Sequence, residues 1–353
     1  MSVTQQNPSV KPNSKVLPFV TVVMPVRNEA DYIANSLGAV LEQDYPADLM
    51  EIIVADGMST DATREVVRSL QARFPNVRLI DNPGKIAPTG LNRAINEARG
   101  DIIVRVDGHC EIEPDYVRRS VEHLQNDGPH GRVDGVGGPI ETIGETAMAE
   151  VIAAAMSSSF GVGGSAFRTV KGRTMLTDTI AFPTYTREII ERGGEYDEEL
   201  VRNQDDEYNY RLRKMGANLL LASDVRSRYY SRGTLKKLFK QYFQYGFWKV
   251  RVLQKHPRQM SLRQFVPPLF VSSLLLSFLL ILFSSYGGWL LAGITGCYLT
   301  VNLVASARTA YKCNRFWLHF ILLPIVYSSL HLSYGLGFLF GLIKFARRWQ
   351  VTE

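Results

Sequence analysis

Between residues 18 and 106, short apolar runs alternate with stretches of helical periodicity. Four nearly continuous apolar runs predict strands of a parallel sheet that is covered on both faces: 20–24, 51–55, 77–80 and 101–106. Three stretches with apolar residues at helical spacing lie between these runs: 30–43, 61–74 and 88–98. Alternation of this kind predicts a doubly wound α/β domain, whose ligands bind at the carboxyl ends of the strands.

The pattern is less regular from residue 114 to residue 232. Helical periodicity recurs at 114–125 and 147–156, and residues 157–172 are rich in Gly and Ser. This last segment lacks the Gly-Lys-Ser/Thr ending of a phosphate-binding P-loop. We therefore interpret it as a flexible lid near the acceptor.

From residue 265 onward the chain is mostly apolar. Residues 265–283 and 289–305 are each long enough, or nearly so, to cross a bilayer, and the short turn between them predicts a hairpin. A third stretch, 316–345, is interrupted by Pro324 and fits either one tilted span or a kinked, re-entrant pair. A single span would put the basic residues that follow it outside, against the positive-inside tendency.

Basic residues gather beside the apolar region. The chain has 353 residues, a formal charge of +6 and a pI near 9.1, but no pattern of a DNA-binding or RNA-binding module, so we expect no nucleic-acid partner. Attraction to an anionic cytoplasmic leaflet accounts for the basic residues: Lys236, Lys237, Lys240, Lys249, Arg251, Lys255, Arg258 and Arg263. The amphipathic stretch 234–253 could pack on the globular part, but its charge and position favour an interfacial helix.

These observations divide the chain into five parts: a flexible tail (1–17), an α/β domain (18–232), amphipathic interfacial helices (233–264), transmembrane helices (265–345) and a short tail (346–353). The first tail has no apolar stretch typical of a signal peptide. The three cysteines have no CxxC spacing. We therefore expect no structural disulfide and a reducing compartment around the α/β domain.

Two acidic signatures carry the candidate chemistry. In the first, Asp107-Gly108-His109 follows the fourth apolar run. It is either an ordinary turn with a structural histidine, or a carboxylate and an imidazole that converge on one divalent cation. The imidazole favours Mn²⁺ somewhat over Mg²⁺. Such a metal can neutralise the diphosphate of a departing nucleotide.

The second signature is Asp205-Asp206-Glu207 at the start of a predicted helix. Some of these acids need only stabilise the helix N-terminus, where the helix dipole favours negative charge. One of them can also serve as a general base on an acceptor hydroxyl. A leaving group that is held by a metal and faces a general base is the arrangement needed to transfer an activated sugar. Asp56, after the second apolar run, either caps a turn or accepts the imide N–H of uracil.

Several further motifs accompany these signatures: Pro25-Val26-Arg27-Asn28-Glu29, Asn82-Pro83-Gly84-Lys85, Gly90-Leu91-Asn92, Gly193-Gly194-Glu195-Tyr196-Asp197 and Gln204-Asp205. Over residues 18–232 the ensemble resembles the GT-A family 2 glycosyltransferases. The tail, including 331–337, is most similar to bacterial exopolysaccharide transferases of the succinoglycan glucosyltransferase type. The resemblance implies a GT-A, Rossmann-like α/β domain followed by transmembrane helices.

The resemblance also implies a role for each matched residue. The residues expected to bind the nucleotide sugar are Pro25, Glu29, Asp56, Lys85 and Asp107. Asp107 and His109 are the expected ligands of a divalent metal, Mn²⁺ or Mg²⁺. Asp205 is the expected catalytic base, because it stands six residues before Arg211 as in the family's motif. The QxxRW signature of processive synthases is absent from the sequence, which favours single addition over polymerisation.

The resulting hypothesis is an inverting hexosyltransferase of exopolysaccharide biosynthesis that moves a sugar, with glucose expected, from a UDP-sugar. The expected acceptor is a lipid-linked glycan of the undecaprenyl diphosphate type. The protein would be a multi-pass protein of the inner membrane with its catalytic domain in the cytoplasm. Two alternatives stay open: a polyprenyl-phosphate glycosyltransferase, and a non-catalytic nucleotide-sugar-binding component of an export assembly. The sequence leaves the sugar, acceptor, linkage, number of membrane spans and oligomeric state open.

Overall fold

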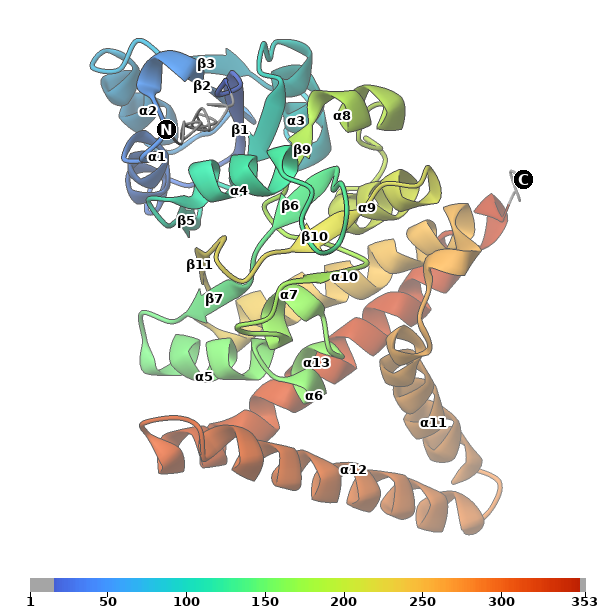
Figure 1. The fold of residues 1–353 in the computed structure, drawn as a ribbon. Helices are drawn as coiled ribbons and strands as arrows, with labels where there is room; N and C mark the ends of the chain where they lie inside the picture. Colours follow the sequence, from blue (N-terminus) through green and yellow to red (C-terminus); the bar gives the residue numbers. More distant parts are fainter. Residues whose placement is uncertain (1–15, 350–353) are drawn as a thin grey trace, which may run out of the picture.

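The computed structural model describes residues 16–349, and Figure 1 shows an α/β domain resting on a set of long C-terminal helices. Most of the expected N-terminal tail and the last four residues lie outside the described range. The fold class expected from the sequence is confirmed, since a mixed α/β sheet precedes three long apolar helices.

The strands form two sheets. Their bounds are β1 Val20–Val26, β2 Met50–Asp56, β3 Val77–Asp81, β4 Ile102–Arg105, β5 Cys110–Ile112, β6 Gly135–Gly137, β7 Ile140–Ile143, β8 Met175–Leu176, β9 Thr184–Thr186, β10 Leu219–Leu221 and β11 Ser227–Tyr230. The larger sheet has the order β3-β2-β1-β4-β9-β6-β10-β8, and the smaller one has the order β5-β11-β7. The four strands predicted from apolar runs are mutually parallel, as expected. The order reverses between β1 and β4, which is where ligands of such sheets bind.

The helices have the following bounds: α1 Ile33–Leu41, α2 Thr63–Gln71, α3 Ala87–Asn96, α4 Tyr116–Gln125, α5 Ala147–Met156, α6 Ser159–Val162, α7 Ala166–Thr169, α8 Arg187–Gly193, α9 Gln204–Lys214, α10 Leu235–Lys255, α11 Val266–Leu280, α12 Tyr286–Ala310 and α13 Phe316–Lys344. Four short 3₁₀ helices complete the set: η1 Ala47–Leu49, η2 Pro257–Gln259, η3 Leu262–Phe265 and η4 Ala346–Arg348.

The two faces of the large sheet bury alternate residues of the same strand. Val22 and Met24 pack with α1 and α2 in one core, whereas Val23 packs with α3 in another. Successive side chains of a strand point to opposite faces, so a strand covered on both sides must be apolar throughout. This is why the apolar runs predicted the central strands.

Helix α13 is the main link between the domain and the apolar region. It runs beside α10 in Figure 1 and also contacts α5 and α6. Glycines allow the close approach, because a Cβ atom at Gly337 would lie 2.0 Å from the Phe243 carbonyl oxygen. Farther along, a Cβ atom at Gly341 would meet the Phe247 carbonyl at 2.7 Å. The two helices therefore pack backbone against backbone.

Both ends of α13 are tied to the α/β domain. Arg315, at its start, lies 3.6 Å from Glu150 of α5, and Arg348, just beyond its end, lies 2.8 Å from Glu199. The third apolar stretch is thus one continuous helix despite Pro324. Its basic C-terminal flank stays beside the domain, so both ends of α13 lie on the side of the domain.

Within residues 16–349, three helical segments are long and apolar enough to cross a membrane: 262–280, 286–310 and 316–344. Helices α11 and α12 form the predicted hairpin, joined by a short turn (Figure 1). Large apolar side chains on both remain exposed, such as Phe278 of α11 and Trp289 of α12. Exposed apolar surface of this extent indicates contact with lipid. Membrane crossing itself stays a prediction.

The basic residues of α10 do not share one role. Lys249 is only 3% exposed and forms an ion pair with Asp206, and Arg251 binds Glu199 at 2.7 Å. The attribution of these two residues to an anionic leaflet is therefore wrong, because domain carboxylates neutralise them. Lys236 and Lys240 are exposed, so their expected contact with a membrane surface stays a prediction.

We predict that Gly337→Ala loosens the packing of α10 on α13. The added methyl would overlap the Phe243 carbonyl, and overpacking of this kind costs about 1–3 kcal/mol. The melting temperature of the detergent-solubilised protein should fall by several degrees. Gly296→Ala, on α12 with no atom within 4 Å of the new Cβ, is the matched control. Equal melting temperatures for the two variants would contradict this account of the packing.

Candidate active site

A cavity of about 1500 Å³ extends from the strand ends of the large sheet to the apolar helices. One end is lined by residues that follow β1, β3 and β4, and the other end by residues of α11, α12 and α13. Helices α9 and α10 and the segment around α6 and α7 form the walls between these ends. The site is therefore assembled from segments far apart in the sequence.

Five of the expected binding residues gather at the strand end of this cavity: Pro25, Glu29, Lys85, Asp107 and His109. Topology explains the convergence, since β1 and β4 are adjacent parallel strands whose carboxyl ends meet at one edge. Lys85 follows β3 in a left-handed conformation with φ 62°, which turns the chain toward the site.

Glu29 and His109 form a pair within the site. The Glu29 carboxylate lies 2.9 Å from His109 Nδ1, and both side chains are largely buried. A carboxylate on one ring nitrogen leaves the other nitrogen available as a metal ligand and fixes the ring's orientation. The sequence assigned Glu29 to the nucleotide sugar, and the structure adds this contact with the expected metal ligand.

Among residues 16–349, no three His, Cys, Asp or Glu side chains gather as a metal-binding set. Divalent cations in nucleotide sites are commonly held by one or two protein ligands together with the substrate phosphates. Asp107, His109 and the supporting Glu29 fit this arrangement. We keep Asp107 and His109 as the proposed ligands.

Arg105 links the two acidic signatures. Its guanidinium contacts Asp107, with Nε 2.9 Å from Oδ1, and also forms an ion pair with Asp205 of α9. Burial lowers the pKa of Arg105, but the neighbouring Asp107 carboxylate outweighs this effect, so the pKa is raised and the residue is charged. Sequence reasoning missed this residue. The sequence did hold one indication of its role. Arg105 is a single arginine within the apolar run 101–106, and a buried arginine must find a partner.

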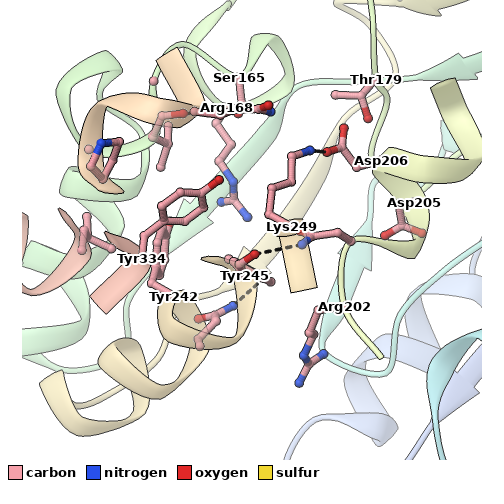
Figure 2. A pocket seen from close by; sticks show the side chains of 18 of the residues that line it. Ser165, Arg168, Thr179, Arg202, Asp205, Asp206, Tyr242, Tyr245, Lys249 and Tyr334 are labelled. Carbon is pink, nitrogen blue, oxygen red and sulfur yellow. Dashed lines mark hydrogen bonds and ion pairs between the residues drawn. The ribbon is translucent and has the colours of Figure 1, made fainter. Parts of the chain in front are cut away.

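The three acids at the start of α9 have different environments. Asp205 and Asp206 line the cavity, whereas the Glu207 side chain is only 3% exposed and faces away from it. Asp206 pairs with Lys249, as Figure 2 shows, and Asp205 is the acid held by Arg105. Asp205 is 39% exposed, so a ligand in the cavity can reach it.

Asp56 lies apart from this cluster. It is completely buried at the end of β2, where Arg64 binds Oδ2 at 2.7 Å and the Ser59 amide donates to the same oxygen. Its Oδ1 has no hydrogen-bond partner among the described residues. A buried acceptor without a donor is costly, so a ligand N–H group that reached Oδ1 would relieve this cost, although Asp56 does not line the cavity.

The Gly/Ser-rich segment 157–172 lines the middle of the cavity, near the expected acceptor position. It contains α6 and α7 and is fastened to α13: His331 Nε2 lies 2.8 Å from the Phe160 carbonyl oxygen, and Tyr327 donates to Ser158 at 2.8 Å. The interpretation as a simple flexible lid is therefore incomplete, because the segment is anchored to a long apolar helix.

Comparison with known proteins identifies the family of this chain. The glycosyl transferase family 2 model matches residues 21–193. A Methanococcus voltae protein is 30% identical over 330 residues, which cover 92% of this chain and 98% of the relative. The chain belongs to glycosyltransferase family 2. It is accordingly a glycosyltransferase.

Two further likenesses agree with this family 2 assignment. The succinoglycan biosynthesis protein ExoA of Rhizobium meliloti is 33% identical over 255 residues, covering 70% of this chain and 73% of that protein. The solved mannosyltransferase PcManGT of Pyrobaculum calidifontis, in complex with GDP-Man and Mn²⁺, has a TM-score of 0.58 and 18% identity. The structural alignment covers 96% of this chain and 91% of the PcManGT chain. This structural likeness shows the GT-A fold.

We predict that His109→Ala weakens Mn²⁺-dependent UDP binding more than it weakens binding of free uridine. Glu29→Gln should have a milder effect of the same kind, about 10- to 100-fold on metal affinity, because it only supports the ligand. Isothermal titration of each variant with UDP at several Mn²⁺ concentrations measures the difference. An unchanged metal titration in His109→Ala would remove this histidine from the site.

Glu207 should stabilise the fold without taking part in binding. Burial raises its pKa, but hydrogen bonds from His256 and Arg211 outweigh burial, so the pKa lies below its usual value of 4.5. Because the folded pKa is depressed, ionised Glu207 stabilises the protein at neutral pH. This contribution starts to disappear below pH 4.5 and is lost as the pH falls through the folded pKa.

Glu207→Gln should therefore lose about 1–3 kcal/mol of stability at pH 7, and the difference from the wild type should shrink as the pH falls below 4.5. Thermal unfolding across this pH range measures the effect. Glu188→Gln removes an exposed ion pair with Arg132 and should have little effect at any pH. A pH-independent difference for Glu207→Gln would show that charge is not the cause.

Proposed function

We propose that the protein is an inverting, metal-dependent hexosyltransferase that moves a sugar, with glucose as the expected one, from a UDP donor to a lipid-linked glycan. One observation carries the proposal. A single cavity joins the strand-end residues, the acid Asp205 and the apolar residues of α11, α12 and α13. Donor, base and lipid would therefore share one continuous space.

The charge of the cavity supports an anionic donor. Its lining includes ten Lys or Arg and five Asp or Glu side chains, and an excess of positive charge attracts diphosphate groups. The unpaired Oδ1 of Asp56 supports the expected hydrogen bond from the uracil imide. A divalent cation bound by Asp107 and His109 would supply the positive charge that stabilises the leaving diphosphate.

Asp205 is the proposed general base. In an inverting transfer, the acceptor oxygen attacks C1 of the sugar, and the bond from C1 to the diphosphate oxygen breaks with its electron pair leaving on UDP. The hydroxyl proton passes to the Asp205 carboxylate. The contact with Arg105 orients this carboxylate toward the strand ends, where the donor would lie.

The acceptor side of the cavity supports a lipid-linked substrate. Apolar residues such as Phe270, Leu290 and Ile294 line it, and they belong to helices that are apolar enough to enter a membrane. The Methanococcus voltae relative is named for transfer to a dolichyl N-acetylglucosaminyl phosphate, and ExoA is named for succinoglycan biosynthesis. These names support an acceptor that already carries a sugar, in polysaccharide biosynthesis.

The proposed location is the cytoplasmic face of the inner membrane. The exposed apolar surfaces of α11 and α12 support membrane contact, and each end of α13 contacts the α/β domain. Membership of a glycosyltransferase family supports an enzyme over a non-catalytic export component. In the alternative polyprenyl-phosphate transferase, a phosphate oxygen is the nucleophile and has no hydroxyl proton to lose.

We predict that Asp205→Asn lowers kcat by about 10² to 10⁴, with donor binding preserved. The amide keeps the shape of the side chain but cannot accept the acceptor's proton. UDP release in membranes containing lipid extract measures turnover, and titration with UDP measures donor binding.

Asp206→Asn is the matched control, because it makes the same change at the neighbouring cavity residue, whose partner is Lys249. We expect it to change kcat much less. Equal losses in both variants would show that the base is assigned to the wrong acid. A nearly silent Asp205→Asn in an active enzyme would favour the polyprenyl-phosphate alternative.

A further inference from the structure

Two arginines in the middle of the cavity lack a carboxylate partner. Arg168 lies on α7 and Arg232 lies just before α10, and both are half-buried in the cavity wall. In the part of the chain that the structure describes, neither guanidinium forms an ion pair with an Asp or Glu side chain. Arg168 donates only to the Thr142 hydroxyl, at 3.1 Å.

Arg168 packs against Tyr229, and Arg232 lies three residues after Tyr229 along the chain. The Arg168 guanidinium carbon is 5.3 Å from the centre of the Tyr229 ring. Burial raises the pKa of Tyr229, and the positive charges of Arg232 and Arg168 oppose that rise. The two charges therefore act on one small region, even though they come from segments more than sixty residues apart.

Several other cationic side chains of the cavity wall have partners within the protein. Arg202, which is also half-buried and has no carboxylate partner among the described residues, donates to the Gln244 side-chain oxygen at 3.3 Å. Arg105 pairs with Asp107 and Asp205, and Lys249 pairs with Asp206. A half-buried guanidinium without a counter-ion is poorly solvated and gains most from a bound anion. The arginines without a carboxylate partner can therefore bind an anionic ligand, whereas the paired side chains hold the site together.

The position of these arginines identifies the kind of anion. In Figure 2, Arg168 reaches into the hollow opposite Asp205 and Asp206, on the side of Tyr242 and Tyr334. Tyr334 belongs to α13, so Arg168 lies between the proposed base and the apolar helices. Hydrogen bonds from α13 to Ser158 and Phe160 fasten the segment that carries Arg168 at this boundary.

We propose that Arg168 and Arg232 bind the phosphate or diphosphate group of the lipid-linked acceptor. This inference rests on the proposed function and names the site of its acceptor. A phosphate held at this boundary would direct the lipid chain along α11–α13 and the sugar toward Asp205. Guanidinium groups suit this role because they bind phosphate oxygens in a bidentate manner.

The test uses the full-length protein in detergent micelles, with UDP and Mn²⁺ present at saturation so that the donor site is filled. The probes are farnesyl diphosphate, farnesol and inorganic pyrophosphate. We expect farnesyl diphosphate to bind more tightly than either of the other two, because only it has both the anion and the chain. Pyrophosphate binding as tightly as farnesyl diphosphate would overturn the assignment to a lipid.

Arg168→Gln and Arg232→Gln should each weaken farnesyl diphosphate binding by about 10- to 100-fold, which corresponds to losing hydrogen bonds to a charged group. Binding of farnesol should not change. The two variants are independent, since Arg232 does not share the hydrogen bond of Arg168 to Thr142. An unchanged farnesyl diphosphate affinity in either variant that still binds UDP would overturn the proposal.

Arg73→Gln is the charge-matched control. Arg73 is exposed, follows α2 and does not line the cavity. An equal loss in this variant would show that the probe senses overall charge and would also overturn the site. UDP release by the wild type with lipid extract is measured separately. Its absence would contradict the proposed function, whereas unaffected arginine variants of an active enzyme would contradict only this inference.

Discussion

The contact of Arg105 with Asp107 and Asp205 holds the site together. Asp107 follows β4 and Asp205 lies in the first turn of α9, so these carboxylates come from segments 98 residues apart along the chain. Two acids facing one cavity repel each other, and a buried guanidinium between them offsets that repulsion. The cost is that Arg105 must remain paired, because a lone buried charge would be strongly destabilising. Architecture and chemistry therefore depend on the same side chain.

The close packing of α10 and α13 is the second constraint. Glycines let these helices approach until backbone meets backbone, and α13 in turn fastens the segment carrying α6 and α7. The apolar helices are thus part of the cavity wall and not a separable anchor. Aromatic residues of α10, including Tyr242, belong to the same core as the central strands. Loss of α13 would expose that core as well as open the cavity.

The sequence was most informative where local pattern determines structure. The strand runs, the helix at 147–156 and the strand-end motifs were all predictable, because periodicity and parallel topology bring the ends of β1 and β4 together. Long-range pairings were not predictable. The partners of Arg105 and Lys249 lie 100 and 43 residues away along the chain, and composition alone made Lys249 look like a surface charge. The path of α13 beside the domain was not predictable either, because it also depends on contacts between residues far apart in the sequence.

The attachment of α13 at both ends has a geometric consequence. A helix of 29 residues, about 43 Å long, is tied to the domain through Arg315 and Arg348, so the domain has little freedom to tilt away from the helices it rests on. With the apolar helices in a membrane, as proposed, the height of Asp205 above the lipid surface would be set by the protein. For the proposed acceptor anchored in that surface, this fixed height would determine which glycans can react. Glycans whose growing end reaches this level would be used, and a chain lengthened by further sugars would extend past it.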